Sequence, residues 1–220
     1  MTKEFVIDLS DLEPSPSSQD QSEQEEKQRT LFDKIIDVIK DYFDKFKGGK
    51  SKRSPLLSWQ EMIYSWISAF CGILFVAALH FNYLEEKHYV FIIGSFGASA
   101  VLIYGVPGAP FSQPRNFFGG NIISAIVGTI VRVLLADLAN VPQIAAAVAV
   151  ATAIVAMQIT NTIHPPGGAV ALIAVLSPPM MWDGFLYIFM PVVTGCLALG
   201  FVAFFVNNLF PGRSYPHFWW

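Results

Sequence analysis

The chain has 220 residues, of which 53% are hydrophobic and only 14% charged, and its formal net charge is -3. This composition is too apolar for an ordinary soluble domain of that length, so we expect an integral membrane protein whose surroundings are a lipid bilayer, with no nucleic-acid partner. Most of the negative charge comes from residues 1–30, which hold eight acidic and three basic residues. The net charge therefore says little about the membrane part.

Residues 1–29 are rich in Asp, Glu, Ser, Gln and Pro, which predicts a disordered acidic tail. They lack the apolar core of a signal peptide and the basic character of a transit peptide, so no organelle address is visible. Residues 30–53 follow as an amphipathic helix and a basic linker, KGGKSKR. The apolar stripe of that helix fits a membrane surface as well as a protein partner. The basic linker predicts that the N-terminus is cytoplasmic. Because no organelle address is visible, we expect a plasma membrane rather than an organelle.

Residues 54–217 are expected to form one transmembrane domain. Four apolar stretches are long enough to cross a bilayer, at about 62–83, 119–139, 142–160 and 185–209. Two further stretches, 89–106 and 168–177, are apolar but rich in small residues, and the second is too short to cross alone. After the first of these stretches, VPGAPFSQPRN at 106–116 is typical of a Pro/Gly loop. The fold class expected is an all-α bundle of four long spans and two shorter or broken helices.

Residues 161–177, NTIHPPGGAVALIAVLS, break an apolar run with a histidine, two prolines and two glycines. Pro165 and Pro166 lack amide hydrogens, and Pro166 disfavours helical backbone at Pro165. One helix should therefore end near Ile163 and the next should begin at Pro166. Because the break falls within apolar sequence, its polar groups require a purpose.

A weak internal repeat aligns GASAVLI at 97–103 with GGAVALI at 167–173. If it is real, a unit of long helix, short helix and long helix occurs twice. Three crossings per unit would relate the halves by inversion, and re-entrant middle elements would make them parallel. Six crossings place the Arg115 loop on the same side as the basic linker, which the positive-inside rule favours.

The candidate substrate-binding residues fall into three groups. The first group is His164, Pro166, Gly167 and Gly168, where a helix start with free amides would attract an anion and the imidazole could donate or accept a proton. The second is Ser95, Gly97 and Ser99, and the third is Arg115 and Asn116, which could form a pore mouth or bind lipid phosphate. The alternatives are a tight kink, close helix packing and an anchoring arginine, respectively.

Other notable residues have structural explanations. Gly120, Ser124 and Gly128 recur every four residues and predict a close-packing face, inside the bundle or between subunits of a homo-oligomer. Arg132 is expected to pair with Asp137 or to extend to the interface. Cys71 and Cys196 read as small buried hydrophobes. No hydrolytic, redox, nucleotide-binding or metal-binding motif occurs in the sequence, so we expect no enzyme, no cofactor and no metal.

Several ordered blocks resemble one family. GSFGASAVLIYGVP at 94–107, QPRNFFGGNIISAIVG at 113–128, MQITNTIHPPGGAVALIAVL at 157–176 and NNLFPGRSYP at 207–216 are similar to the HPP family of integral membrane proteins. This resemblance implies a membrane domain usually described with four spanning helices and a transport activity, since plant members are associated with nitrite transport into the chloroplast. The acidic tail departs from a plastid transit peptide.

The sequence thus predicts a secondary transporter or channel for a small inorganic anion, nitrite by resemblance, with the HPPGG helix start as its site. The alternative is a non-transporting membrane scaffold that recruits a partner through its N-terminal region.

Overall fold

The computed structural model describes residues 31–47, 56–84, 93–177 and 184–220. The predicted disordered tail and most of the predicted basic linker lie outside these residues. The chain divides into two units, Met1–Pro55 and Leu56–Trp220. In the first, a helix over 31–44 is followed by a 3₁₀ turn, η2 (Lys45–Lys47).

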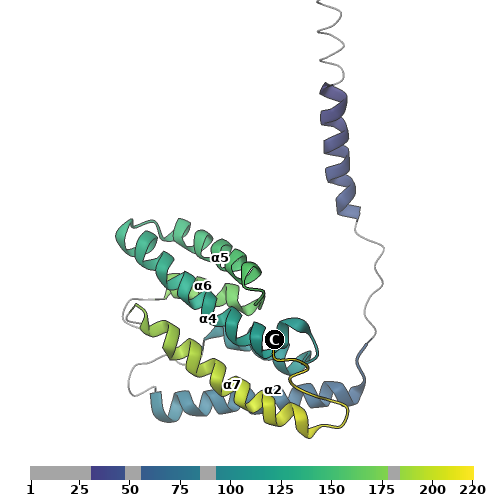
Figure 1. Ribbon diagram of the computed structural model, residues 1–220, viewed down its shortest axis with the longest axis vertical. Coiled ribbons are helices and arrows are strands. Elements are labelled where there is room, and N and C mark those ends of the chain that lie inside the picture. The colour runs from purple at the N-terminus through teal and green to yellow at the C-terminus, as the bar shows by residue number, and fades with distance from the viewer. Residues whose placement is uncertain (1–30, 48–55, 85–92, 178–183) are drawn as a thin grey trace, which may run out of the picture. The chain divides into compact units, whose positions relative to one another are not determined.

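The second unit is a bundle of helices, and no strand occurs among its described residues (Figure 1). Four helical stretches have the length and hydropathy of membrane spans: Trp59–Tyr83, Pro114–Leu138, Pro142–Ile159 and Ile188–Leu209. They comprise α2 (Trp59–Leu79) with η3 (His80–Leu84), α4 (Pro114–Val131) with η7 (Arg132–Leu138), α5 (Pro142–Ile159), and η8 (Ile188–Val193) with α7 (Thr194–Val206) and η9 (Asn207–Leu209). Two shorter helices are α3 (Gly94–Ala100) with η5 (Val101–Gly105), and α6 (Pro166–Leu176). The predicted fold class is confirmed.

Local sequence explains where several helices begin. Pro114, Pro142 and Pro166 each occupy the first helical position, where the missing amide hydrogen costs nothing. At the start of α2, the Ser58 side chain accepts a hydrogen bond from the backbone amide of Glu61.

The predicted loop at 106–116 is partly wrong. A 3₁₀ turn, η6 (Pro110–Ser112), lies within it, and α4 begins at Pro114, five residues before the expected start at Gly119. The amide of Phe117 bonds to the carbonyl of Gln113 at 2.8 Å, which closes the first turn of α4. Proline favours a helix start as well as a loop, so the QPRN sequence could not distinguish the two.

The helices pass through the bundle in alternating directions. Arg213, after the last helix, bonds to Glu61 at the start of α2 and to the carbonyl of Tyr104 at the end of η5. Gln113, directly before α4, accepts the amide hydrogen of His217. These ends therefore share one side of the bundle, which we call the proximal end. Arg115 lies there too, in the first turn of α4. Six crossings remain a prediction, because only four of the described helices have the length of a span.

The helices pair in a reciprocal way: α2 packs on α7, and α4 packs on α5 (Figure 1). These two pairs would be equivalent in two inverted three-helix units, but the extensive contact of α4 with α6 has only a much smaller counterpart between α7 and α3. The internal repeat itself remains a prediction.

The small-residue face of α4 packs against α6 and the turn before it. A Cβ atom at Gly120 would lie 2.6 Å from the Thr162 carbonyl oxygen, and one at Gly128 would lie 2.7 Å from the Ala171 carbonyl oxygen. The close-packing prediction is confirmed, and the contact is within the chain. The Arg132 prediction is confirmed as well, because its Nε lies 3.6 Å from Asp137.

Candidate functional site

The interrupted sequence forms a tight turn between α5 and α6. Helix α5 ends at Ile159, and Asn161 adopts a positive φ of 53°, which asparagine tolerates better than most residues. The amide of Thr162 then bonds back to the Met157 carbonyl at 2.8 Å. The first helix thus ends four residues earlier than predicted, whereas α6 begins at Pro166 as expected.

His164 is fully buried and joins three segments of the chain. Its Nδ1 lies 2.8 Å from the carbonyl oxygen of Phe111, and its Nε2 lies 2.9 Å from the hydroxyl of Ser99. A carbonyl oxygen can only accept, so Nδ1 carries a proton. In the neutral ring Nε2 is then an acceptor, and the Ser99 hydroxyl donates to it. The imidazole therefore links the turn before α6 to α3 and to the turn before α4.

This junction packs against the first half of the Pro114–Leu138 span. Gly120 packs against the backbone of His164, with 3.3 Å separating a Cβ at Gly120 from the His164 nitrogen. If the middle of the Pro114–Leu138 span, Ile126, marks the bilayer midplane, Gly120 is about 9 Å from it. The hydrocarbon half-thickness of a bilayer is about 15 Å, so on that placement the junction would lie within the hydrocarbon.

The free amides expected at the start of α6 are absent from the described structure. The Gly167 amide donates to the carbonyl of His164 at 2.8 Å, and the Gly168 amide donates to Pro165 at 3.1 Å. Gly167 is also crowded, because a Cβ there would lie 2.6 Å from the Ser124 hydroxyl and 3.0 Å from the Met157 sulfur. The glycines thus serve close packing and a compact turn. The turn closes on itself because its own carbonyls lie within reach, which residue types alone could not reveal.

Arg115 and Asn116 lie in the first helical turn of α4. Their side chains bond to the connection between α5 and α6 from the proximal side. The Arg115 guanidinium donates to the Thr160 carbonyl at 3.0 Å, and the Asn116 amide donates to the Ile163 carbonyl at 2.8 Å. The Arg115 side chain also lies over the Trp220 ring, 5.5 Å from its centroid. Its Nε is buried without a hydrogen-bond partner among the described residues.

A cavity of about 350 Å³ opens at this position. It is lined by Pro110, Phe111, Arg115, Asn116, Asn161, Ile163, Phe218 and Trp220. Phe111 and Ile163 are respectively the hydrogen-bond partner and the chain neighbour of His164. The cavity therefore lies directly over the buried junction.

The remaining predicted residues, Ser95 and Gly97, lie on different sides of α3. The Ser95 hydroxyl is buried, one helical turn from Ser99, and has no hydrogen-bond partner in the described part of the chain; the hydroxyl of Ser124, against Gly167, is in the same state. Gly97 is exposed on α3, and a Cβ there would meet open space. The predicted residues that lie together around this turn are His164, Ser99, Arg115, Asn116 and Pro166–Gly168. Gly97 faces away from them, on the exposed side of α3.

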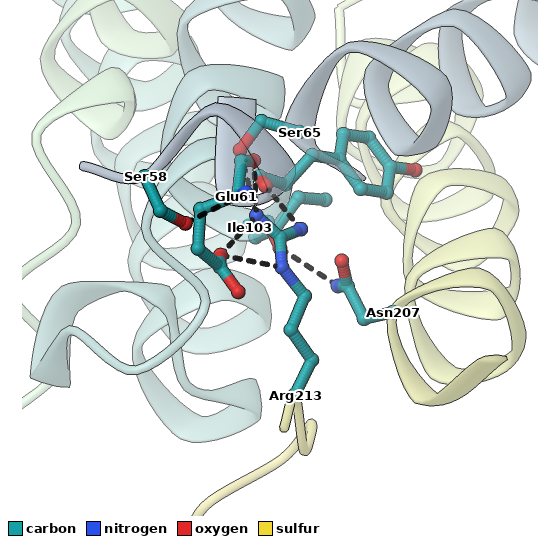
Figure 2. Close-up of polar contacts among 7 residues, drawn as sticks. Ser58, Glu61, Ser65, Ile103, Asn207 and Arg213 are labelled. Atoms are coloured by element: carbon teal, nitrogen blue, oxygen red, sulfur yellow. Dashed lines mark hydrogen bonds and ion pairs between the residues drawn. The ribbon is translucent and has the colours of Figure 1, made fainter. Parts of the chain in front are cut away.

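Sequence reasoning missed the clamp formed by the C-terminal segment. Arg213, whose side chain is only 3% exposed, lies 2.7 Å from the Glu61 carboxylate and also bonds to the Ser65 hydroxyl (Figure 2). Figure 2 also shows the Asn207 side chain beside it, bonded to the Ile103 carbonyl. The signal available was charge: Glu61 is the one acidic residue of the first span, and an acid in an apolar helix requires a partner.

Two further residues fix this segment over the 106–113 turn. The buried Gln113 side chain accepts the amide hydrogen of His217 and donates to the carbonyls of Pro107 and Ala109. The Tyr215 hydroxyl donates to the Ser112 carbonyl at 2.7 Å. Burial raises the pKa of Tyr215 above its usual range, so the phenol remains a donor.

Two more cavities flank the proximal end. One, of about 220 Å³, is lined mainly by apolar groups between the start of α4 and Trp219 and Trp220. The other, of about 440 Å³, lies between Glu61, the 105–109 turn and His217. Within the described residues, no group of three His, Cys, Asp or Glu side chains is placed to hold a metal ion.

Four apolar spans, two short helices and a polar junction buried between them, all helical in the described part of the bundle, define an integral membrane protein. The chain belongs to the HPP family: the family model for the HPP transmembrane region matches residues 54–216.

Two relatives from Dictyostelium discoideum, both described as transmembrane proteins, are similar to this chain. One is 49% identical over 180 residues, covering 81% of this chain and 57% of the relative. The other is 43% identical over 193 residues, covering 87% of this chain and 67% of the relative. The chain thus spans little more than half the length of the first relative. No solved structure matches the chain.

Proposed function

We propose that this protein transports a small monovalent anion, nitrite being the first candidate, as a secondary transporter or channel. The observation that carries the proposal is the buried His164–Ser99 contact, with the unpartnered hydroxyls of Ser95 and Ser124 on the neighbouring turns of α3 and α4. Buried polar groups without partners are costly in a bundle surrounded by lipid, and hydroxyl donors suit a dehydrated anion.

The route would begin at the cavity over the junction. Arg115 supplies positive charge and a buried Nε donor, and Asn116 is its neighbour on the first turn of α4. The anion would then pass the turn at His164 by displacing the Ser99 contact. Pro166, Gly167 and Gly168 would act through the shape of the turn, since both glycine amides are already bonded.

Protonation of His164 offers a means of coupling, because a charged imidazole donates from both nitrogens and would pair with an entering anion. The positive-inside rule, applied to the basic linker, would place the proximal end in the cytoplasm. The membrane that we propose is the plasma membrane.

The test is flux through purified full-length protein in liposomes under gradients of nitrite, nitrate, formate and chloride. We expect nitrite-dependent flux that falls at least tenfold in His164→Ala and severalfold in Ser99→Ala. Ser177→Ala is the matched control, because this hydroxyl only caps the far end of α6 through the Ile173 carbonyl. Absence of flux with all four anions, or equal flux in His164→Ala and Ser177→Ala, would contradict the proposal.

A membrane scaffold is the second candidate, favoured by the large apolar side chains that the helix over 31–44 leaves exposed. It predicts that deletion of residues 1–53 abolishes cellular function while His164→Ala is tolerated. Transport predicts the reverse.

A further inference from the structure

The helix over 31–44 and the turn after it separate apolar from charged side chains without exception. At about 100° per residue, the apolar side chains fill an arc of roughly 160°. They are Leu31, Phe32, Ile35, Ile36, Val38, Ile39, Tyr42, Phe43 and Phe46. The charged side chains fill the opposite arc: Asp33, Lys34, Asp37, Lys40, Asp41, Asp44 and Lys45.

The apolar face lies uncovered. Its nine side chains are between 45% and 70% exposed. At its C-terminal end, the rings of Tyr42, Phe43 and Phe46 contact one another, with centroids 5.3 to 6.0 Å apart. A continuous apolar face of this size requires an occupant.

The covalent connection limits which occupant can reach it. Eleven residues, 48–58, separate η2 from the first span, which begins at Trp59. Fully extended, they reach about 40 Å at most. The helix is therefore held within that distance of a bilayer surface at all times, and the effective concentration of lipid around it is high.

The shape of the face also favours a flat occupant. A helix that packs on a coiled-coil partner needs only a narrow seam of two positions per heptad, whereas this face covers nearly half of the circumference. A helix half-immersed at the acyl boundary has this proportion, with aromatic and large aliphatic side chains in the lipid. We infer that the helix over 31–44 is an in-plane membrane anchor whose apolar face lies in the same bilayer that holds the spans.

The charged arc indicates which interaction would hold the helix on the lipid. It carries four Asp and three Lys side chains, so it has almost no net charge. Apolar burial rather than attraction to anionic lipid drives the binding, and added salt should weaken it little. The inference does not depend on anion transport, and it leaves the apolar face unavailable for recruiting a partner.

The experiment uses the full chain in phosphatidylcholine vesicles, after replacing both native cysteines by Cys71→Ala and Cys196→Ala. A polarity-sensitive fluorophore is attached at Ile39→Cys, near the middle of the apolar arc, or at Asp37→Cys, on the opposite side. We expect lipid-borne nitroxide to quench the label at position 39 severalfold more than at 37, and aqueous iodide to show the opposite order. Raising the salt concentration from 0.05 to about 0.5 M should leave both results within twofold.

Equal iodide access at both positions would overturn the inference, because the helix would then lie in water. Protection of position 39 from both quenchers would overturn it in favour of a protein partner or a second copy. Introducing Ile35→Asp with Phe43→Asp should reduce lipid quenching at position 39 severalfold. The matched pair Asp33→Asn with Asp41→Asn should not.

Discussion

The Nε2 atom of His164 lies 2.9 Å from the hydroxyl of Ser99, although 65 residues separate them in the chain. This contact joins the turn before α6 to the middle of the α3–η5 helix. With the Nδ1 bond to Phe111, it makes one imidazole the link between the two short helices and the turn before α4. The predictions below concern this junction and the segments that enclose it.

The junction predicts unequal costs for two substitutions. His164→Ala removes both contacts and leaves the Phe111 carbonyl without its donor, so the free energy of unfolding should fall by about 2–4 kcal/mol. Ser99→Ala leaves the Phe111 bond intact and should cost about 1 kcal/mol. Thermal denaturation in detergent, followed by tryptophan fluorescence, measures both. A larger loss in Ser99→Ala would contradict the assignment of His164 as the centre of the link.

The two adjacent glycines of the motif should respond oppositely to alanine. Gly167→Ala places a methyl group against Ser124 and Met157 and should cost about 1–3 kcal/mol, with reduced yield of folded protein. Gly168→Ala meets only Val150, at an ordinary 3.9 Å, and should be neutral or stabilising by up to about 1 kcal/mol through helix propensity. Detergent melting temperatures of the two variants provide the comparison, and equal destabilisation would be evidence against this packing.

Replacing Arg213 should destabilise the protein more than replacing its ion-pair partner Glu61. Arg213 also bonds to the Glu61 carbonyl, the Ser65 hydroxyl and the Tyr104 carbonyl, so Glu61→Gln leaves several of its contacts in place. Arg213→Ala removes all of them and should cost about 3 kcal/mol, against about 1 kcal/mol for Glu61→Gln. Comparing the single variants with the double variant isolates the ion pair, and equal losses would show that the carboxylate alone holds the arginine.

Trp220 should limit access to the cavity over the junction. Its ring lies over the Arg115 guanidinium and lines the cavity, whereas Trp219 stacks on Phe204 with centroids 5.3 Å apart and does not line that cavity. In liposomes, Trp220→Ala should therefore raise anion flux a few-fold. Trp219→Ala should leave it within twofold. An unchanged flux in Trp220→Ala would separate the cavity from the transport route.

Sequence periodicity and composition were enough to predict the four spans, the two short helices and the broken stretch at HPPGG. These features depend on local chemistry: the length of apolar runs, the missing amide of proline and the small size of glycine. The spacing of Gly120, Ser124 and Gly128 likewise predicted close packing. The helix start at Pro114 could not be separated from a loop, because proline suits both.

Only the tertiary structure decided which polar groups meet. The sequence could name His164, Ser99, Arg115 and Asn116 as candidates, but pairing them depends on segments that are distant in the chain. The same is true of the Gly167 and Gly168 amides, which were expected to be free and are bonded to the carbonyls of their own turn. The type of a residue determines which hydrogen bonds its groups can donate or accept. Only the packing of α3, α4 and α6 determines which of those groups find a partner and which remain without one.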